Sequence, residues 1–407
     1  MMGRKLVAVL FGLLMIGMTI GVGSVHAEEG VTVILVSDNA ADNAIASYLA
    51  NLTGAIVVTT TWGIYDPNVT AEILSYAPDR VIIIGGPDAV VGEYIADLEE
   101  YNLSVYRWWG ANRYETDISV MDNATKLFGL KFNASVIVPG NDSLAVKTAL
   151  RLAVQNRAMI IYANESTNVT KLMEKFRVRN AIMVQSRVSE RVMEKVAREL
   201  RTCNCTAKRV QANVTKEEVE RLLEQVRERL MAAEKIANAT NSTQLMEQVR
   251  EMLQLMEKAN QSLQAGNVTK AYALALKLQV RSEFMLKEAS RELRVAMKKN
   301  GKLALEMELK KIEAQLKVLE RAGVKVDSVQ MVLDKVREAI NAGNYSVAKA
   351  LLKEAKKALH ELYKTRGESV RKVSAPGTHR EPPKPPVSNP SNQSSPGMGS
   401  QPKGGGH

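Results

Sequence analysis

The sequence predicts an α/β fold of two tandem modules with parallel sheets, followed by an all-α antiparallel helical bundle region. Short β-branched runs alternate with helical stretches as far as residue 212, which is typical of sheets flanked by helices. The same segment contains an internal duplication. Beyond it the apolar residues recur only at helical spacing. A chain of 407 residues is long enough for several domains.

The N-terminus predicts export. Arg4 and Lys5 precede an apolar run at residues 6–20, and small residues follow up to Ala27. This is the pattern of a signal peptide at residues 1–27, cleaved after Ala27. An uncleaved anchor is the alternative, although the run is shorter than the roughly 20 residues that span a bilayer. No later stretch is apolar over such a length. We therefore expect an extracellular, envelope-associated protein with no transmembrane segment after cleavage.

The α/β segment has six predicted strands, because its apolar runs are continuous, as in parallel strands covered on both faces. They lie at residues 31–36, 55–59, 80–84, 135–138, 158–162 and 181–184. Residues 33–60 align with residues 136–163 at an offset of 103. The duplication defines a module at residues 28–130 and a degenerate copy at residues 131–212.

The two modules carry opposite charge. The first holds 15 acidic and 4 basic side chains, a net charge of −11, and the second holds 6 acidic and 15 basic, a net charge of +9. Opposite charges favour packing of the modules against each other. An acidic ligand on the second module is the alternative.

The helical spacing of apolar residues in residues 213–372 predicts six helices, arranged in two three-helix units. Helix breaks are expected near Asn238 to Asn241, Gly266, Asn300, Gly323 and Gly343. The 31 basic and 22 acidic side chains of this region are interspersed, as on solvated helix faces, so no nucleic-acid partner is expected. Residues 373–407 are rich in Pro, Ser and Gly and predict a disordered tail.

Sixteen of the 24 asparagines lie in Asn-x-Ser/Thr sequons, where chance would give about three. This excess predicts heavy N-glycosylation, although some of these asparagines are also good helix caps and turn residues. The candidate sites are Asn51, Asn68, Asn102, Asn123, Asn133, Asn141, Asn164, Asn168, Asn204, Asn213, Asn238, Asn241, Asn260, Asn267, Asn344 and Asn392.

The two cysteines, Cys203 and Cys205, are separated by one residue. In an oxidising compartment they form either a local disulfide or a bond to another chain.

Histidine is confined to positions 26, 360, 379 and 407. This argues against Ser/His/Asp and Cys/His catalysis and against histidine-ligated zinc over most of the chain. We therefore expect no enzyme, no metal and no cofactor.

Polar residues follow two of the predicted strands of the first module. Asp38, Asn39 and Asp42 follow the first strand, and Gly85 and Gly86 follow the third. Ligands of open α/β sheets bind at such strand ends, whereas helix capping and a tight turn are the alternatives. Since neither loop has a nucleotide-binding pattern, no nucleotide is expected.

Together with Gly110 and the run Arg113-Tyr114-Glu115-Thr116, these residues resemble the cell-wall-binding repeat 2 family of tandem surface-layer protein modules. The resemblance implies a Toprim-like or Rossmann-like fold, no catalysis and non-covalent attachment to an anionic envelope polymer or surface-layer component. It marks Asn39, Asp42, Gly85, Gly86, Arg113 and Tyr114 as ligand-binding candidates. A purely structural ion pair between Arg113 and Glu115 is the alternative for that motif. With the many sequons, the resemblance suggests an archaeal envelope.

The function predicted from the sequence is therefore that of a glycosylated, non-catalytic envelope protein. Its modules attach to the envelope, and its helical region extends outward as a spacer or contacts partners. A homo-oligomer, formed through the modules or the helical region, is also compatible with the sequence. The alternative is a secreted small-ligand binder or carboxylate-dependent enzyme that uses the cleft at Asp38, Asn39 and Asp42.

Overall fold

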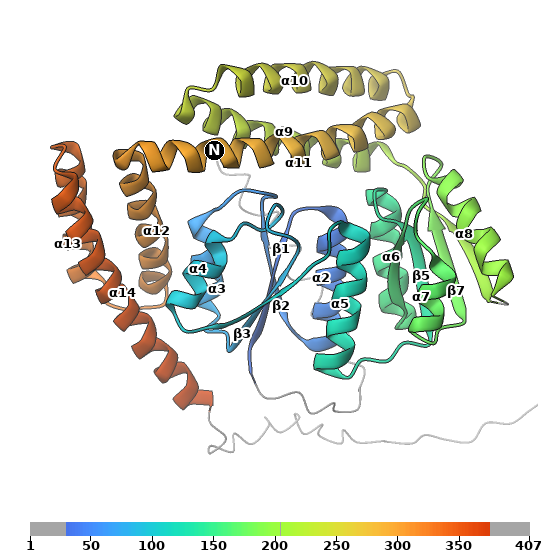
Figure 1. The fold of residues 1–407 in the computed structure, drawn as a ribbon, viewed down its shortest axis with the longest axis horizontal. Coiled ribbons are helices and arrows are strands. Elements are labelled where there is room, and N and C mark those ends of the chain that lie inside the picture. The colour runs from blue at the N-terminus through green and yellow to red at the C-terminus, as the bar shows by residue number, and fades with distance from the viewer. Residues whose placement is uncertain (1–29, 204, 375–407) are drawn as a thin grey trace, which may run out of the picture.

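A computed structural model describes residues 30–203 and 205–374 of the chain (Figure 1). The predicted signal peptide, Asn204, Asn392 and nearly all of the predicted tail lie outside the described residues. The first module contains β1 (Thr32–Ser37), α2 (Ala40–Thr53), β2 (Ile56–Thr60), α3 (Pro67–Ser75), β3 (Arg80–Ile84), α4 (Glu93–Glu100), β4 (Ser104–Trp108) and α5 (Arg113–Phe128). The second contains β5 (Ala134–Pro139), α6 (Ser143–Asn156), β6 (Met159–Ala163), α7 (Val169–Lys175), β7 (Asn180–Gln185), α8 (Glu190–Thr202) and β8 (Thr206–Gln211).

Each module is built on a four-stranded parallel sheet with flanking helices. The strand orders are β2-β1-β3-β4 and β6-β5-β7-β8, so the duplication seen in the sequence is repeated in the topology. Residues Val33 to Val36 of β1 are all fully buried, because helices cover both faces of this strand. The observed class is therefore α/β followed by helices, as predicted.

The structure corrects the strand count, since β4 and β8 were not predicted. β8 has the sequence TAKRVQ, and five of its six residues are exposed. β4 alternates exposed and half-buried side chains up to its last residue, Trp108, which is buried. Both lie at one edge of their sheet, and unlike the edge strands β2 and β6 they lack a continuous apolar run. Their pairing with β7 and β3 therefore depends on tertiary structure.

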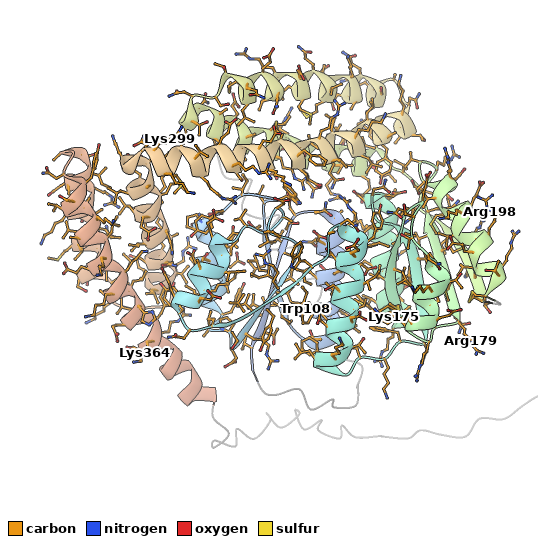
Figure 2. All side chains as sticks on the ribbon, in the orientation of Figure 1. Trp108, Lys175, Arg179, Arg198, Lys299 and Lys364 are labelled. Atoms are coloured by element: carbon orange, nitrogen blue, oxygen red, sulfur yellow. A yellow bond between two sulfur atoms is a disulfide. The ribbon has the colours of Figure 1, made fainter. Side chains whose placement is uncertain are left out.

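The modules pack against each other, as their opposite charges favoured. Helices α2 and α6 are in contact, and the small side chains Ala44 and Ala149 belong to one apolar core. The Tyr162 hydroxyl donates a hydrogen bond of 2.5 Å to the Ala41 carbonyl across this interface. The basic side chains Arg179 and Arg198 of the second module point outward (Figure 2).

Six helices follow: α9 (Lys216–Thr240), α10 (Thr243–Gln264), α11 (Val268–Lys299), α12 (Gly301–Arg321), α13 (Asp327–Asn341) and α14 (Tyr345–Ser374). Helices α9, α10 and α11 pack together, and so do α12, α13 and α14. Gly266 and Gly343 adopt left-handed φ angles of +76° and +75°, which ends the preceding helix and turns the chain.

The helical region does not extend outward, which corrects the spacer prediction. Helix α11 runs across both modules, and α12 packs against α3 of the first module (Figure 1). The apolar face of β1 that includes Val33 and Leu35 shares a core with Leu316 and Leu333 of α12 and α13. Among the described residues, no helix is both long enough and apolar enough to cross a membrane.

Candidate functional site

The strand ends of the first module form a pocket of about 440 Å³. Four of the six predicted ligand-binding residues line it, namely Asn39, Asp42, Gly86 and Arg113. Trp62, Trp109 and Glu283 complete much of the wall. Because Glu283 lies on α11, the helical region forms part of the site.

Asn39 connects the start of α2 to the helical region. Its Oδ1 accepts a hydrogen bond of 2.9 Å from the Ala41 backbone N–H, so it is the N-cap of the helix. Its Nδ2 donates a hydrogen bond of 2.7 Å to Glu283 Oε1. The capping alternative is therefore correct for Asn39, but this side chain also fixes the position of α11.

Arg229 of α9 lies over the same strand end. Its Nη2 and Nε are 2.8 Å and 3.0 Å from the two carboxylate oxygens of Asp38. Its Nη1 is 3.3 Å from Glu283 Oε1. The Arg229 side chain is 1% exposed. The buried guanidinium of Arg229 thus binds the Asp38 carboxylate of the first module and the Glu283 carboxylate of the helical region. The bidentate contact with Asp38 fixes the position of α9 relative to the first module.

Asp42, close to Arg113 and Glu283, is also buried. Burial raises its pKa to about 6, against the opposing effect of the Arg113 guanidinium, and the Glu283 carboxylate adds to the increase. Burial also raises the pKa of the nearby Asp117 well above its ordinary value, although Asp117 accepts a hydrogen bond from the Tyr162 backbone N–H. Asp42 can therefore exchange a proton near neutral pH.

The structure contradicts an ion pair between Arg113 and Glu115. Arg113 Nη1 donates a 3.0 Å hydrogen bond to the Gly140 carbonyl of the second module, and Nη2 lies 3.5 Å from Glu283. Glu115 instead accepts a 3.0 Å hydrogen bond from the Ala111 backbone N–H, because it belongs to the N-terminal cap of α5.

Of the six predicted ligand-binding residues, Tyr114 and Gly85 lie outside the pocket and Gly86 lines it. Tyr114 does not line the pocket, and it lies close enough to Gly140 that a side chain there would approach its ring at 3.0 Å. Gly85 has φ +119°, a value that favours glycine, and it lies outside the pocket wall. A Cβ on Gly86 would lie 3.1 Å from the Trp109 ring.

The second module has an equivalent contact with α11. Asp142, which aligns with Asn39 at the offset of 103, caps α6. Its carboxylate accepts hydrogen bonds of 2.6 Å from the Ser186 hydroxyl and 2.8 Å from the Tyr272 hydroxyl of α11. Asp142 is 1% exposed. Both strand-end edges are thus covered by the same helix.

Sequence reasoning did not find the residues that cover these edges, Arg229, Glu283 and Tyr272. One signal was available for Arg229, because it falls between Val226 and Ala233 on the buried stripe of α9. A charged residue on an apolar stripe needs a buried partner. The partner cannot be identified from spacing, since Asp38 lies 191 residues away.

The sequons and cysteines are placed as follows. Of the 14 sequon asparagines within the described residues, none is buried, and Asn123, Asn164 and Asn260 are half-buried while the others are exposed. Asn168 and Asn267 also cap helices. The Cys203 and Cys205 sulfurs are bonded to each other. Within the described ranges, no three His, Cys, Asp or Glu side chains gather in a group that could hold a metal ion.

Comparisons with known proteins give limited similarity. No family model matches the chain. An uncharacterized protein from Methanocaldococcus jannaschii is 35% identical over 181 residues, which are 44% of this chain and 52% of the relative. The chain thus spans about half the length of this curated relative.

Two solved structures are similar to part of the chain, Cwp6 and Cwp8 from Clostridium difficile. Each is 21% identical. Cwp6 has a TM-score of 0.36 over 44% of this chain and 29% of its own. Cwp8 has a TM-score of 0.37 over 46% of this chain and 31% of its own.

Proposed function

We propose that this chain is an exported, N-glycosylated protein that attaches non-covalently to the cell envelope and catalyses no reaction. The observation that carries the proposal is that α11 binds both strand-end edges, although a pocket of about 440 Å³ stays at the first. Enzymes with open α/β sheets keep these edges accessible to substrate. Here Glu283 and Tyr272 bind the capping residues Asn39 and Asp142, so each edge is a site of attachment for the helical region.

The exposure of the sequons supports a glycosylated surface. None of the described sequon asparagines is buried, so oligosaccharides at these positions require no rearrangement of the core. The proposed host has a glycosylated envelope of the archaeal kind, and a surface-layer component is the proposed partner. Self-association through the modules or the helical region belongs to the same proposal.

Fractionation of native cells tests the proposal, with the full chain detected in each fraction. We expect the protein in the envelope fraction, at an apparent mass above the 44.8 kDa of the polypeptide, and chemical deglycosylation should lower that mass. Purified full chain should sediment with isolated envelopes and be released without cleavage of a covalent bond. Recovery of the protein only in the soluble fraction, whatever envelope preparation is used, would reject attachment.

A second function is supported by the pocket at Asp42. A buried carboxyl with a pKa of about 6 beside Arg113 suits a small-ligand binder or a carboxylate-dependent enzyme. The substitution Asp42→Asn separates the two functions. Attachment to envelopes should persist in this variant, whereas binding or turnover that needs the carboxyl should be lost.

A further inference from the structure

Two tryptophan side chains line the pocket at the strand ends of the first module. Trp62 follows β2 and is half-buried, whereas Trp109 follows β4 and is 47% exposed. The Trp109 ring packs beside Gly86, where a Cβ would lie 3.1 Å from it, so its position is fixed while about half of the residue stays accessible. The face of a tryptophan ring attracts a cation that lies within about 6 Å of its centre.

The charges around this pocket do not balance. Four charged residues line it, and their ion-pair partners bring the group to four carboxylates and three cations. The carboxylates are those of Asp38, Asp42, Asp88 and Glu283, and the cations are Arg113, Arg229 and Lys287. Every carboxylate of this group except Asp42 forms an ion pair with one of these cations. With Asp42 ionised, one negative charge is therefore in excess.

Asp42 carries this excess charge. The residue lines the pocket although it is only 8% exposed. The Ser37 hydroxyl donates a hydrogen bond to it, and Arg113 is the cation that lowers its pKa. However, the Nη1 and Nη2 atoms of Arg113 are occupied by the Gly140 carbonyl and the Glu283 carboxylate. A cation in the pocket would supply the counter-charge that this buried carboxylate lacks.

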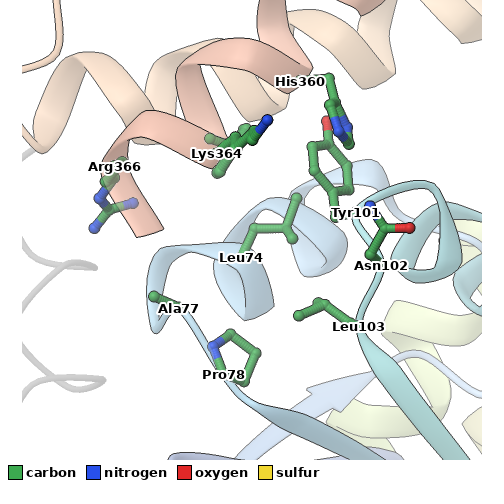
Figure 3. A pocket seen from close by; sticks show the side chains of 10 residues that line it. Leu74, Ala77, Pro78, Tyr101, Asn102, Leu103, His360, Lys364 and Arg366 are labelled. Carbon is green, nitrogen blue, oxygen red and sulfur yellow. The ribbon is translucent and has the colours of Figure 1, made fainter. Parts of the chain in front are cut away.

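The other pocket of the first module does not suit a cation. It has a volume of about 290 Å³ and lies between the N-terminal ends of β3 and β4 and helix α14. Figure 3 shows Lys364 and Arg366 of α14 beside it. None of the described residues that line it is acidic, so it offers no counter-charge. A cation is therefore expected at the strand ends alone of these two pockets.

We propose that the strand-end pocket binds a small organic monocation, such as a quaternary ammonium compound, whose charge lies against Asp42 and whose methyl groups contact the rings of Trp62 and Trp109. This inference rests on the small-ligand function proposed above for the same pocket and gives that ligand its chemical class. The volume of about 440 Å³ is large enough for such a ligand. Neither Asn39 nor Asn112, the asparagines that line the pocket, belongs to a sequon, so no sugar is attached to its wall.

Calorimetric titration of the full chain with choline, and with its neutral isostere 3,3-dimethyl-1-butanol, tests the proposal at about pH 7.5, where Asp42 is ionised. We expect choline to bind with a Kd of about 1 mM or tighter. The neutral alcohol should bind at least about tenfold more weakly, because it has the shape of choline without the charge.

Substitutions locate the binding. Trp109→Leu keeps an apolar side chain but removes the ring, and should weaken choline about fivefold or more. The matched control is Tyr106→Leu, since the Tyr106 ring on β4 is 45% exposed and lies outside the pocket, and it should have no effect. Asp42→Asn should weaken choline about tenfold or more and change the affinity for the neutral alcohol by less than about twofold. Thermal unfolding confirms that each variant is folded.

Three results would overturn the proposal. They are equal affinity for choline and the neutral alcohol, unchanged choline affinity in a folded Asp42→Asn or Trp109→Leu variant, and no binding of choline at about 10 mM. Equal affinity would reject the charge of the ligand but keep a small-ligand function for the pocket. Should either variant fail to fold, the comparison of the two ligands on the unmodified chain still decides. Sedimentation with envelopes tests attachment separately, because it needs no ligand in this pocket.

Discussion

At the scale of single residues, buried charges hold the helical region on the first module. Arg229 is 1% exposed and contacts the carboxylates of Asp38 and Glu283. Removing one member of such a group leaves a buried charge unpaired, which costs more than the whole group contributes. Arg229 is therefore the residue whose loss should affect stability most directly.

We expect Arg229→Met to lower the free energy of unfolding by about 3–5 kcal/mol. Urea denaturation of the full chain measures the change. The matched control is Arg227→Met on the same helix, since Arg227 is exposed and its contact with Glu224 is 3.7 Å long. The control should change stability by less than about 1 kcal/mol. Equal effects of the two substitutions would contradict a structural role for the buried cluster.

The raised pKa of Asp42 predicts that the stability of the folded chain depends on pH. Its pKa in the folded protein is about 6, above the ordinary value of 3.8. Between these values the folded state binds more protons than the unfolded state, so stability decreases as pH rises from about 4 to about 6. The full effect is about 3 kcal/mol.

Replacement by Asn removes that ionisation. The difference in free energy of unfolding between Asp42→Asn and the unmodified chain should therefore change by about 2 kcal/mol between pH 4 and pH 7, in favour of the variant at pH 7. Urea denaturation at both values measures it, and ¹³C NMR of the Asp42 carboxyl should show the titration directly. A difference that is constant with pH would show that burial does not raise this pKa.

At the scale of elements, α12 is held on the first module by a second buried pair. Lys311 Nζ lies 2.5 Å from Asp97 Oδ1, and the two side chains are 9% and 7% exposed. Asp97 also accepts hydrogen bonds from the Tyr65 and Thr70 hydroxyls. Burial raises the pKa of Asp97, and Lys311 opposes the increase. The carboxylate thus joins α3, α4 and α12.

Lys311→Met should loosen α12 because it leaves the Asp97 carboxylate without a cation. We expect the free energy of unfolding to fall by about 3 kcal/mol and the amides of α12 to exchange with solvent faster than in the unmodified chain. Hydrogen exchange with mass spectrometry gives the local change. Lys310→Met, at the neighbouring exposed position, is the control. Unchanged exchange in α12 would show that its apolar face alone holds it in place.

At the scale of the whole molecule, α11 makes the two modules and the helical region one structure. Along one helix, Tyr272 binds Asp142 of the second module and Glu283 binds Asn39 of the first. Core residues of both modules share a single apolar cluster with α9, α10 and α11. The modules are therefore not expected to be stable without these helices.

A chain ending at residue 212 should aggregate, or unfold at a temperature lower by about 10 °C or more, because its buried polar edges and apolar faces become exposed. A chain ending at residue 300 retains α9 to α11 and should remain closer to the full chain. Light scattering and thermal unfolding of the three chains make the comparison. A stable, monomeric chain of residues 28–212 would contradict the structural role of the helical region.

The sequence by itself determined the α/β class, the duplication and the helix breaks. These follow from local patterns, since a continuous apolar run such as residues 80–84 predicts a covered strand wherever it occurs. The sequence also indicated where Asn39, Asp42 and Gly86 gather, because parallel strands end at one edge, whereas only the family resemblance marked Arg113 as a candidate.

The tertiary structure alone decided what covers that edge. The contacts from Arg229 to Asp38 and from Tyr272 to Asp142 join residues separated by 191 and 130 positions, and no periodicity encodes such a pairing. The tertiary structure also decided the strands β4 and β8. Their own residues show no strand pattern, and each pairs through backbone hydrogen bonds with a neighbouring strand, β3 or β7. Local patterns thus specify the elements, whereas burial on assembly selects the partners of each polar side chain.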